Sequence, residues 1–181
     1  MLGKEKVRSR LLLNDLGDIT QFCRRVETPA DGDRPGGYAR AMGESPRFAL
    51  TSTVLGAPDA RELARFYRAL LGWTVRADEP WWVVLAAPGG GAGLSFQTED
   101  AYVRPVWPEE PGRQQMMLHL DIAVEDLGAA VERATALGAD LADHQPQEDV
   151  RVCLDPAGHP FCLYTPSPAD PRHRPVKLRG S

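Results

Sequence analysis

His119 and Asp121 lie two residues apart in an alternating apolar segment, residues 117–124. The alternation predicts a strand, and side chains two positions apart on a strand share one face. An imidazole titrates near neutral pH and can accept a proton from a substrate, while a neighbouring carboxylate can orient the ring or bind a polar group. His119 is therefore a candidate catalytic residue, and both residues are candidate ligand contacts. The alternative, that His119 is a core or lining residue hydrogen-bonded to a neighbour, stays open.

Aromatic residues gather in two places, although only 7% of the chain is aromatic. Trp81 and Trp82 are adjacent, so in a strand they point to opposite faces and only one of them, here assigned as Trp82, can contact a ligand. Trp107 lies in a proline-rich connection, residues 101–112, where it could close the mouth of a cavity. Flat rings suit planar apolar ligands, but they can equally fill a cleft or a subunit interface.

Several other residues that could do chemistry are assigned structural roles. The glycine-rich segment 89–93 lacks the Lys-Ser/Thr of a phosphate loop and leads into a strand. His159 lies in a turn whose Asp, Pro and Gly residues have structural functions. Cys23, Cys153 and Cys162 show no C-x-x-C spacing, which argues against a disulfide scaffold or a structural zinc cluster and favours a reducing cytoplasm.

An internal repeat supplies the elements that position these residues. At a nearly constant offset, Asp59, Gly72 and Pro88 recur as Asp126, Gly138 and Pro156. In each copy a strand leads to an Asp that can cap a helix, the helix ends at Gly, and three strands follow. The expected strands are 48–55, 74–77, 81–86 and 93–98 in the first copy and 118–124, 140–143, 150–154 and 161–165 in the second. The pattern predicts an α+β fold of tandem βαβββ units.

The flanking segments differ from this repeat in composition. Residues 1–46 are rich in turn formers and charge and predict a loosely ordered extension, and residues 167–181 predict a flexible tail. Between them we expect one domain, residues 47–166, made of a first unit (47–100), a connecting loop (101–114) and a second unit (115–166).

The composition excludes several classes of function. The chain has 181 residues and a formal net charge of −4, without the basic balance of a nucleic-acid-binding protein. No apolar run approaches the roughly 20 residues that a transmembrane helix needs, so no membrane partner is expected. We expect a cytoplasmic protein.

Four segments carry a resemblance to a known superfamily: 66–73 (Phe-Tyr-Arg-Ala-Leu-Leu-Gly-Trp), 102–108, 119–121 and 155–163 (Asp-Pro-Ala-Gly-His-Pro-Phe-Cys-Leu). With the tandem βαβββ pattern, the chain resembles the vicinal-oxygen-chelate superfamily, which includes glyoxalase I, extradiol dioxygenases, and bleomycin- and fosfomycin-resistance proteins. It is most similar there to actinobacterial glyoxalase-like proteins. The resemblance implies a cup-shaped mixed sheet and, in metal-using relatives, an ion held by the first and last strands of each unit.

Carried over by position, the resemblance implies a depleted metal site. The position seven residues before the capping Asp is His119 in the second unit and Ser52 in the first. The last-strand position is Cys162 in the second unit and either Ser95 or Gln97 in the first. One imidazole, one thiol and weak donors are fewer ligands than a catalytic ion usually has.

The first functional hypothesis is therefore a glyoxalase/bleomycin-resistance-like protein that binds a small apolar or aromatic molecule without a catalytic metal. In this hypothesis the ligand makes apolar contacts with Trp82, Phe96 and Trp107. It makes polar contacts with Gln97, His119 and Asp121. The alternative is a lyase, isomerase or dioxygenase with a single divalent metal ion, in which His119 is a metal ligand or general base. A third hypothesis is an interaction module that binds a partner through residues 1–46. A homodimer is compatible with all three.

Overall fold

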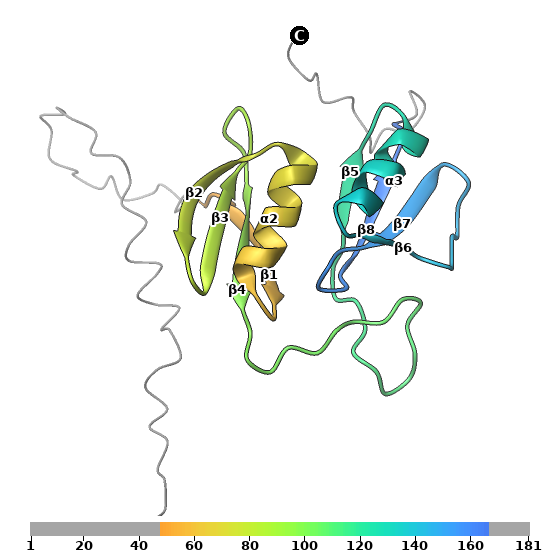
Figure 1. Ribbon diagram of the computed structural model, residues 1–181, viewed down its shortest axis with the longest axis horizontal. Coiled ribbons are helices and arrows are strands. Elements are labelled where there is room, and N and C mark those ends of the chain that lie inside the picture. Colours follow the sequence, from red (N-terminus) through yellow and green to blue (C-terminus); the bar gives the residue numbers. More distant parts are fainter. Residues whose placement is uncertain (1–47, 167–181) are drawn as a thin grey trace, which may run out of the picture. The chain divides into compact units, whose positions relative to one another are not determined.

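The computed structural model describes residues 48–166, which form two successive βαβββ modules (Figure 1). The first module consists of β1 (Ser52–Ala57), α2 (Ala60–Leu71), β2 (Thr74–Glu79), β3 (Trp82–Ala86) and β4 (Gly93–Thr98). The second consists of β5 (Leu120–Ala123), α3 (Leu127–Ala136), β6 (Asp140–Leu141), β7 (Val150–Leu154) and β8 (Pro160–Tyr164). The α+β tandem fold is as predicted. The expected extension, 1–46, and tail, 167–181, lie outside the described residues.

Each module forms its own four-stranded mixed sheet, with strand orders β1-β4-β3-β2 and β5-β8-β7-β6. The first and last strands of each module pair in parallel, and the other neighbours are antiparallel. Both first strands begin later than predicted. Ser52 pairs with Gly93, where β4 begins. Before it, Thr51 still accepts a hydrogen bond from the Gly93 backbone N–H at 2.9 Å, whereas Phe48 is 92% exposed.

Asp residues cap both helices, as the repeat predicted. The Asp59 carboxylate accepts a hydrogen bond from the Glu62 backbone N–H at 2.9 Å, and Asp126 accepts one from Ala129 at 2.9 Å. Gly72 ends α2 in the left-handed conformation, with φ of 69°, which costs glycine little. The local signals therefore define both helices.

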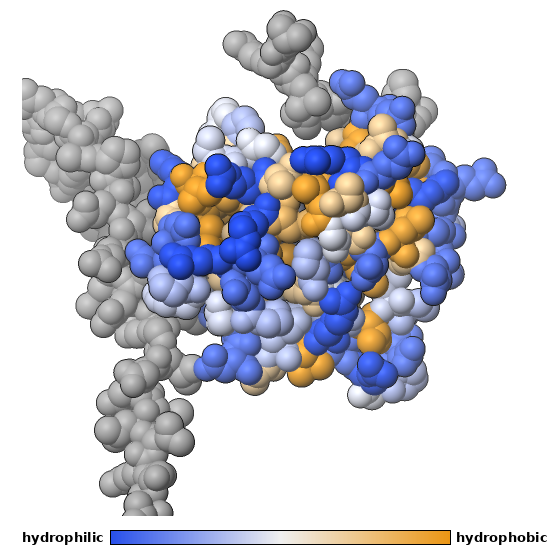
Figure 2. All heavy atoms as spheres, viewed as in Figure 1, coloured by the Kyte–Doolittle hydropathy of each residue, from blue (hydrophilic) through white to orange (hydrophobic). Residues whose placement is uncertain are grey.

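The apolar face of α2 packs on one side of the first sheet. Leu63, Phe66 and Tyr67 are buried there, whereas Arg65 and Arg68 face water. Figure 2 shows the resulting surface, on which charged and apolar side chains are interspersed. In the described part of the chain, both helices are too short and too polar to cross a bilayer.

The core continues from the first module into the second. The Phe66 ring lies 5.9 Å from that of Phe161 on β8, and the Tyr67 ring lies 6.2 Å from it. Beside these rings, the Tyr67 hydroxyl donates a 3.0 Å hydrogen bond to the buried Asp155 carboxylate. This junction joins α2 to the turn between β7 and β8.

Candidate functional site

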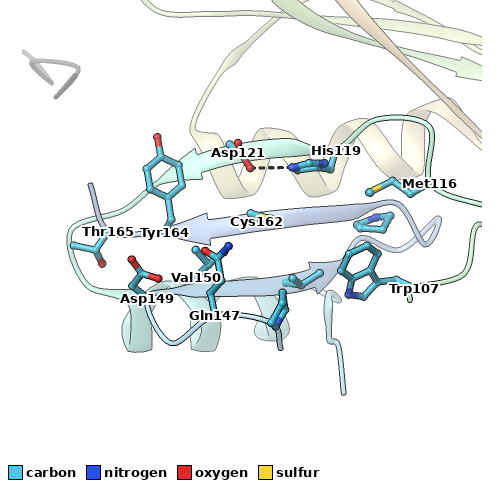
Figure 3. A pocket seen from close by; sticks show the side chains of 13 residues that line it. Trp107, Met116, His119, Asp121, Gln147, Asp149, Val150, Cys162, Tyr164 and Thr165 are labelled. Atoms are coloured by element: carbon cyan, nitrogen blue, oxygen red, sulfur yellow. Dashed lines mark ion pairs between the residues drawn. The ribbon is translucent and has the colours of Figure 1, made fainter. Parts of the chain in front are cut away.

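A cavity of about 610 Å³ lies on one face of the second sheet (Figure 3). Phe161 and Leu163 on β8 are buried in the core, so the alternating Cys162 and Tyr164 point to the opposite face and line the cavity. Trp107 and Met116 lie at one end in Figure 3, and Tyr164 lies towards the other. The strand pleat thus separates the core of this module from its candidate site.

Three chemically active side chains meet along one side of this cavity. His119 immediately precedes β5, Asp121 lies on β5, and Cys162 pairs with Asp121 in the β5–β8 ladder. His119 Nε2 lies 3.3 Å from Asp121 Oδ1, and one donor atom from each of the three residues lies within 4.8 Å of the others. The predicted common face of His119 and Asp121 is confirmed. Cys162 lies beside Asp121 only through the β5–β8 register, which the sequence alone does not show.

Asp121 is the shared partner in this group, which we call the His-Asp-Cys cluster. Burial raises the pKa of the Cys162 thiol to about 11, and the Asp121 charge and hydrogen bonding to Asp121 act in the same direction. Cys162 is thus a protonated thiol at neutral pH in the structure as described. The Asp121 carboxylate therefore lies between an imidazole and a thiol.

The cluster has the donor chemistry of a divalent metal site. It offers an imidazole nitrogen, a carboxylate oxygen and a sulfur atom, and catalytic zinc sites typically use three protein ligands and leave a fourth position open. His119, Asp121 and Cys162 would hold such an ion. The ion would supply Lewis-acid chemistry at the cavity wall.

The equivalent positions of the first module contain two hydroxyl groups. Ser95 pairs with Val54 in the β1–β4 ladder just as Cys162 pairs with Asp121, so Ser95 rather than Gln97 is the counterpart of Cys162. Ser52 and Ser95 hydrogen-bond to each other with an Oγ–Oγ distance of 2.6 Å, and Ser95 is buried. Each hydroxyl of this pair thus has a hydrogen-bond partner within the first module. The candidate site is therefore the cavity of the second module.

Three residues expected to contact a ligand lie outside this cavity. Phe96 is fully buried under α2, where its ring stacks on Tyr67 at 5.5 Å, so its assignment as a ligand contact is corrected. Trp82 and Gln97 are paired on β3 and β4 of the first module, and neither lines the cavity. Strand alternation explains the error, since Phe96 and Gln97 are adjacent and cannot face the same side.

Trp107 is the aromatic residue whose predicted place at a cavity mouth matches the structure. It lines the cavity, and its indole N–H is buried without a hydrogen-bond partner among the described residues. Its ring lies 6.3 Å from that of His144. Tyr164 and Gln147 also line the cavity and were missed. Alternation from Cys162 would have found Tyr164, whereas Gln147 follows no regular pattern.

A second cavity, of about 360 Å³, lies where the two modules and their connection meet. Met116 and Pro160 line both cavities, so the two are adjacent. Tyr102 and His159 contribute to the second cavity, with the rings 5.7 Å apart. His159 also contacts the buried Asp155 through Nδ1 at 3.0 Å, in keeping with its predicted structural role.

A sequence model of the glyoxalase-like domain matches residues 52–164. The chain belongs to this family. The resemblance to the vicinal-oxygen-chelate superfamily is thereby confirmed. No curated protein matches the chain.

Solved structures share the fold of this glyoxalase-like domain. One is a glyoxalase/bleomycin resistance protein/dioxygenase family enzyme from Burkholderia phytofirmans, with 19% identity, a TM-score of 0.51, and coverage of 65% of this chain and 98% of that one. Another, an Agrobacterium tumefaciens protein solved by NMR, has 18% identity, a TM-score of 0.51, and coverage of 66% and 98%. At these identities the likeness concerns the fold of the domain.

Proposed function

We propose that this glyoxalase-like domain binds a small molecule with an apolar or aromatic body in the cavity of its second module. The observation that carries the proposal is the lining itself, which combines Trp107, Met116 and Val152 with the polar His-Asp-Cys cluster. Ligand sites typically combine apolar walls with polar groups that fix orientation, and here further polar side chains such as Gln147 and Asp149 share the lining with the apolar ones. Its volume of about 610 Å³ suits a small organic molecule.

The unpartnered indole N–H of Trp107 supports this proposal. A buried donor without an acceptor costs about 1–3 kcal/mol. The N–H is closed to solvent, so a ligand oxygen or nitrogen would accept from it after a rotation of the Trp107 ring, and the ring face would pack on the apolar body. Trp107 is therefore proposed as the main ligand contact, and His119 and Asp121 as polar contacts.

Titration with the neutral fluorophore Nile red tests this assignment. We expect saturable binding that falls at least about tenfold in Trp107→Ala, since a buried aromatic contact is commonly worth more than 1.4 kcal/mol. The control is Val103→Ser, which changes the second cavity and leaves the first intact. Equal loss in both variants, or no loss in Trp107→Ala, would contradict a binding site at Trp107.

The His-Asp-Cys cluster favours a second candidate function, a metal-dependent lyase, isomerase or dioxygenase. In this case His119 is a metal ligand, whereas in a sequestering protein Asp121 orients it towards a bound molecule. The two functions are separated by the fate of the ligand, which a sequestering protein releases unchanged. A bound ion lost in His119→Ala together with chemical conversion would favour the enzyme.

The remaining expectations concern location and assembly. We propose a cytoplasmic protein that has neither nucleic acid nor membrane as a partner. A homodimer is the proposed assembly, and light scattering on the full chain measures it directly.

A further inference from the structure

One wall of the cavity is the loop between β6 and β7, residues 142–149, whose Pro146, Gln147 and Asp149 line it. We infer that the side-chain amide of Gln145 positions this wall and so determines how tightly the cavity holds its ligand. Gln145 does not itself line the cavity, so it acts through its neighbours in the loop. The inference rests on the proposed function and adds a positioning residue to the same site.

The Gln145 amide is inserted into the ladder between β6 and β7. Its Oε1 accepts a hydrogen bond from the Val152 backbone N–H at 2.9 Å. Its Nε2 donates to the Ala142 carbonyl at 2.7 Å and to the Val152 carbonyl at 2.9 Å. Ala142 and Val152 are both buried, and unpaired backbone groups in buried residues are costly. This one side chain therefore fixes the path of the loop.

The first module has a tight turn where the second has this loop. There, β2 is six residues long and pairs with β3 as far as Glu79 and Trp82. In the second module β6 has two residues, and its ladder ends at Leu141. The Ala142 N–H still bonds to the Val152 carbonyl at 3.0 Å, after which the chain leaves the sheet. The amide is thus inserted at the point where the paired strand ends and the cavity wall begins.

Arg151 holds the other end of the loop. Its Nη1 donates to the Glu148 carbonyl at 2.9 Å and to the Gln147 carbonyl at 3.4 Å. Val150 and Val152 line the cavity, so the alternating Arg151 points to the opposite face of the sheet. Two side chains outside the cavity, Gln145 and Arg151, therefore hold the loop at its two ends.

The neighbours of Gln145 reach different parts of the site. The His144 ring lies 6.3 Å from that of Trp107, the proposed main ligand contact. On the other side of Gln145, Gln147 lines the cavity, and in Figure 3 it lies across β8 from Asp121. A preorganised wall reduces the conformational entropy that is lost on binding. Loss of the Gln145 amide should therefore weaken binding although no ligand contact is removed.

Substitution of Gln145 by methionine tests the inference, because methionine keeps the length of the side chain and removes the amide. Amide hydrogen exchange of the full chain, followed by NMR, should be faster at Val152, whose N–H loses its acceptor. The affinity for Nile red should fall about tenfold, since the wall must then be ordered on binding. The emission of the bound dye should move to longer wavelength, because a loosened wall admits water.

Two further variants serve as controls. Glu148→Met places the same side chain in the same loop, at a residue that does not line the cavity. Asp126→Ala weakens the cap of α3 in the same module, also outside the cavity, and so controls for lowered stability. Both variants should bind Nile red like the parent chain.

The outcomes distinguish this inference from the proposed function. Unchanged exchange at Val152, or unchanged Nile red affinity in Gln145→Met, would overturn the positioning role. An equal loss of affinity in Asp126→Ala would assign the loss to lowered stability and overturn it as well. Failure of the parent chain to bind Nile red would reject the proposed function, and exchange at Val152 would then decide alone whether Gln145 holds the loop.

Discussion

At the scale of single residues, Asp155 shows how the chain stabilises a buried charge. It is fully buried, and its carboxylate accepts hydrogen bonds from the Tyr67 hydroxyl at 3.0 Å and the His159 backbone N–H at 2.9 Å. Burial, followed by the Asp155 charge, raises the pKa of Tyr67 well above its usual value, so Tyr67 remains a donor. Removal of one donor would leave the carboxylate less well compensated.

Tyr67→Phe should therefore lower the free energy of unfolding by about 1–3 kcal/mol, because a hydrogen bond to a buried charge is lost while the ring remains. Urea denaturation measures the change. Tyr102→Phe is the comparison, since Tyr102 donates at 2.9 Å to the neutral Ala157 carbonyl, and its loss should cost less. An unchanged free energy of unfolding in Tyr67→Phe would show that Asp155 does not depend on Tyr67.

At the scale of elements, the capping Asp residues of α2 and α3 contribute to stability through a local hydrogen bond in each helix. Asp59→Ala and Asp126→Ala should each lower the free energy of unfolding by about 1 kcal/mol, because each leaves backbone donors in the first helical turn without an acceptor. Thermal unfolding followed by circular dichroism measures both. Asp100→Ala, in the loop after β4, is the control and should have little effect. Full stability in Asp59→Ala would contradict the capping role.

The elements were predictable where the signal is local. Asp59 and Asp126 mark the helix starts and Gly72 marks the end of α2, whereas α3 ends at Leu137 in the helical region, one residue before Gly138 with φ of 107°. The partner strand of β1 is a long-range property, so the sequence could not show that its ladder starts only at Ser52. The site follows the same rule. Alternation placed His119 beside Asp121, whereas the approach of Cys162 required the β5–β8 register.

At the scale of the whole molecule, buried thiols link stability to pH. Burial raises the pKa of Cys153 from 9.0 to about 11, so the folded state holds this proton over a range in which the unfolded state releases it. The contribution is fully present below pH 9 and is lost as the pH rises to about 11. The pKa of Cys162 is raised in the same way.

We therefore expect the free energy of unfolding to fall between pH 9 and pH 11, measured by urea denaturation at both values. In Cys153→Ala the free energy of unfolding should fall less between pH 9 and pH 11 than in the parent chain, because the variant lacks this thiol. The comparison concerns this difference and not the stability of the variant below pH 9. An equal decline in both chains would assign the loss to other groups. A rise in stability over this range would contradict the direction of the shift.

The two modules share a backbone framework but differ at three equivalent positions, and this difference has a consequence for protein engineering. The first module offers a ready scaffold on which a second donor set could be installed by the substitutions Ser52→His, Val54→Asp and Ser95→Cys. The second module would serve as the template for this design, because each substituted position of the first module has a structural equivalent there.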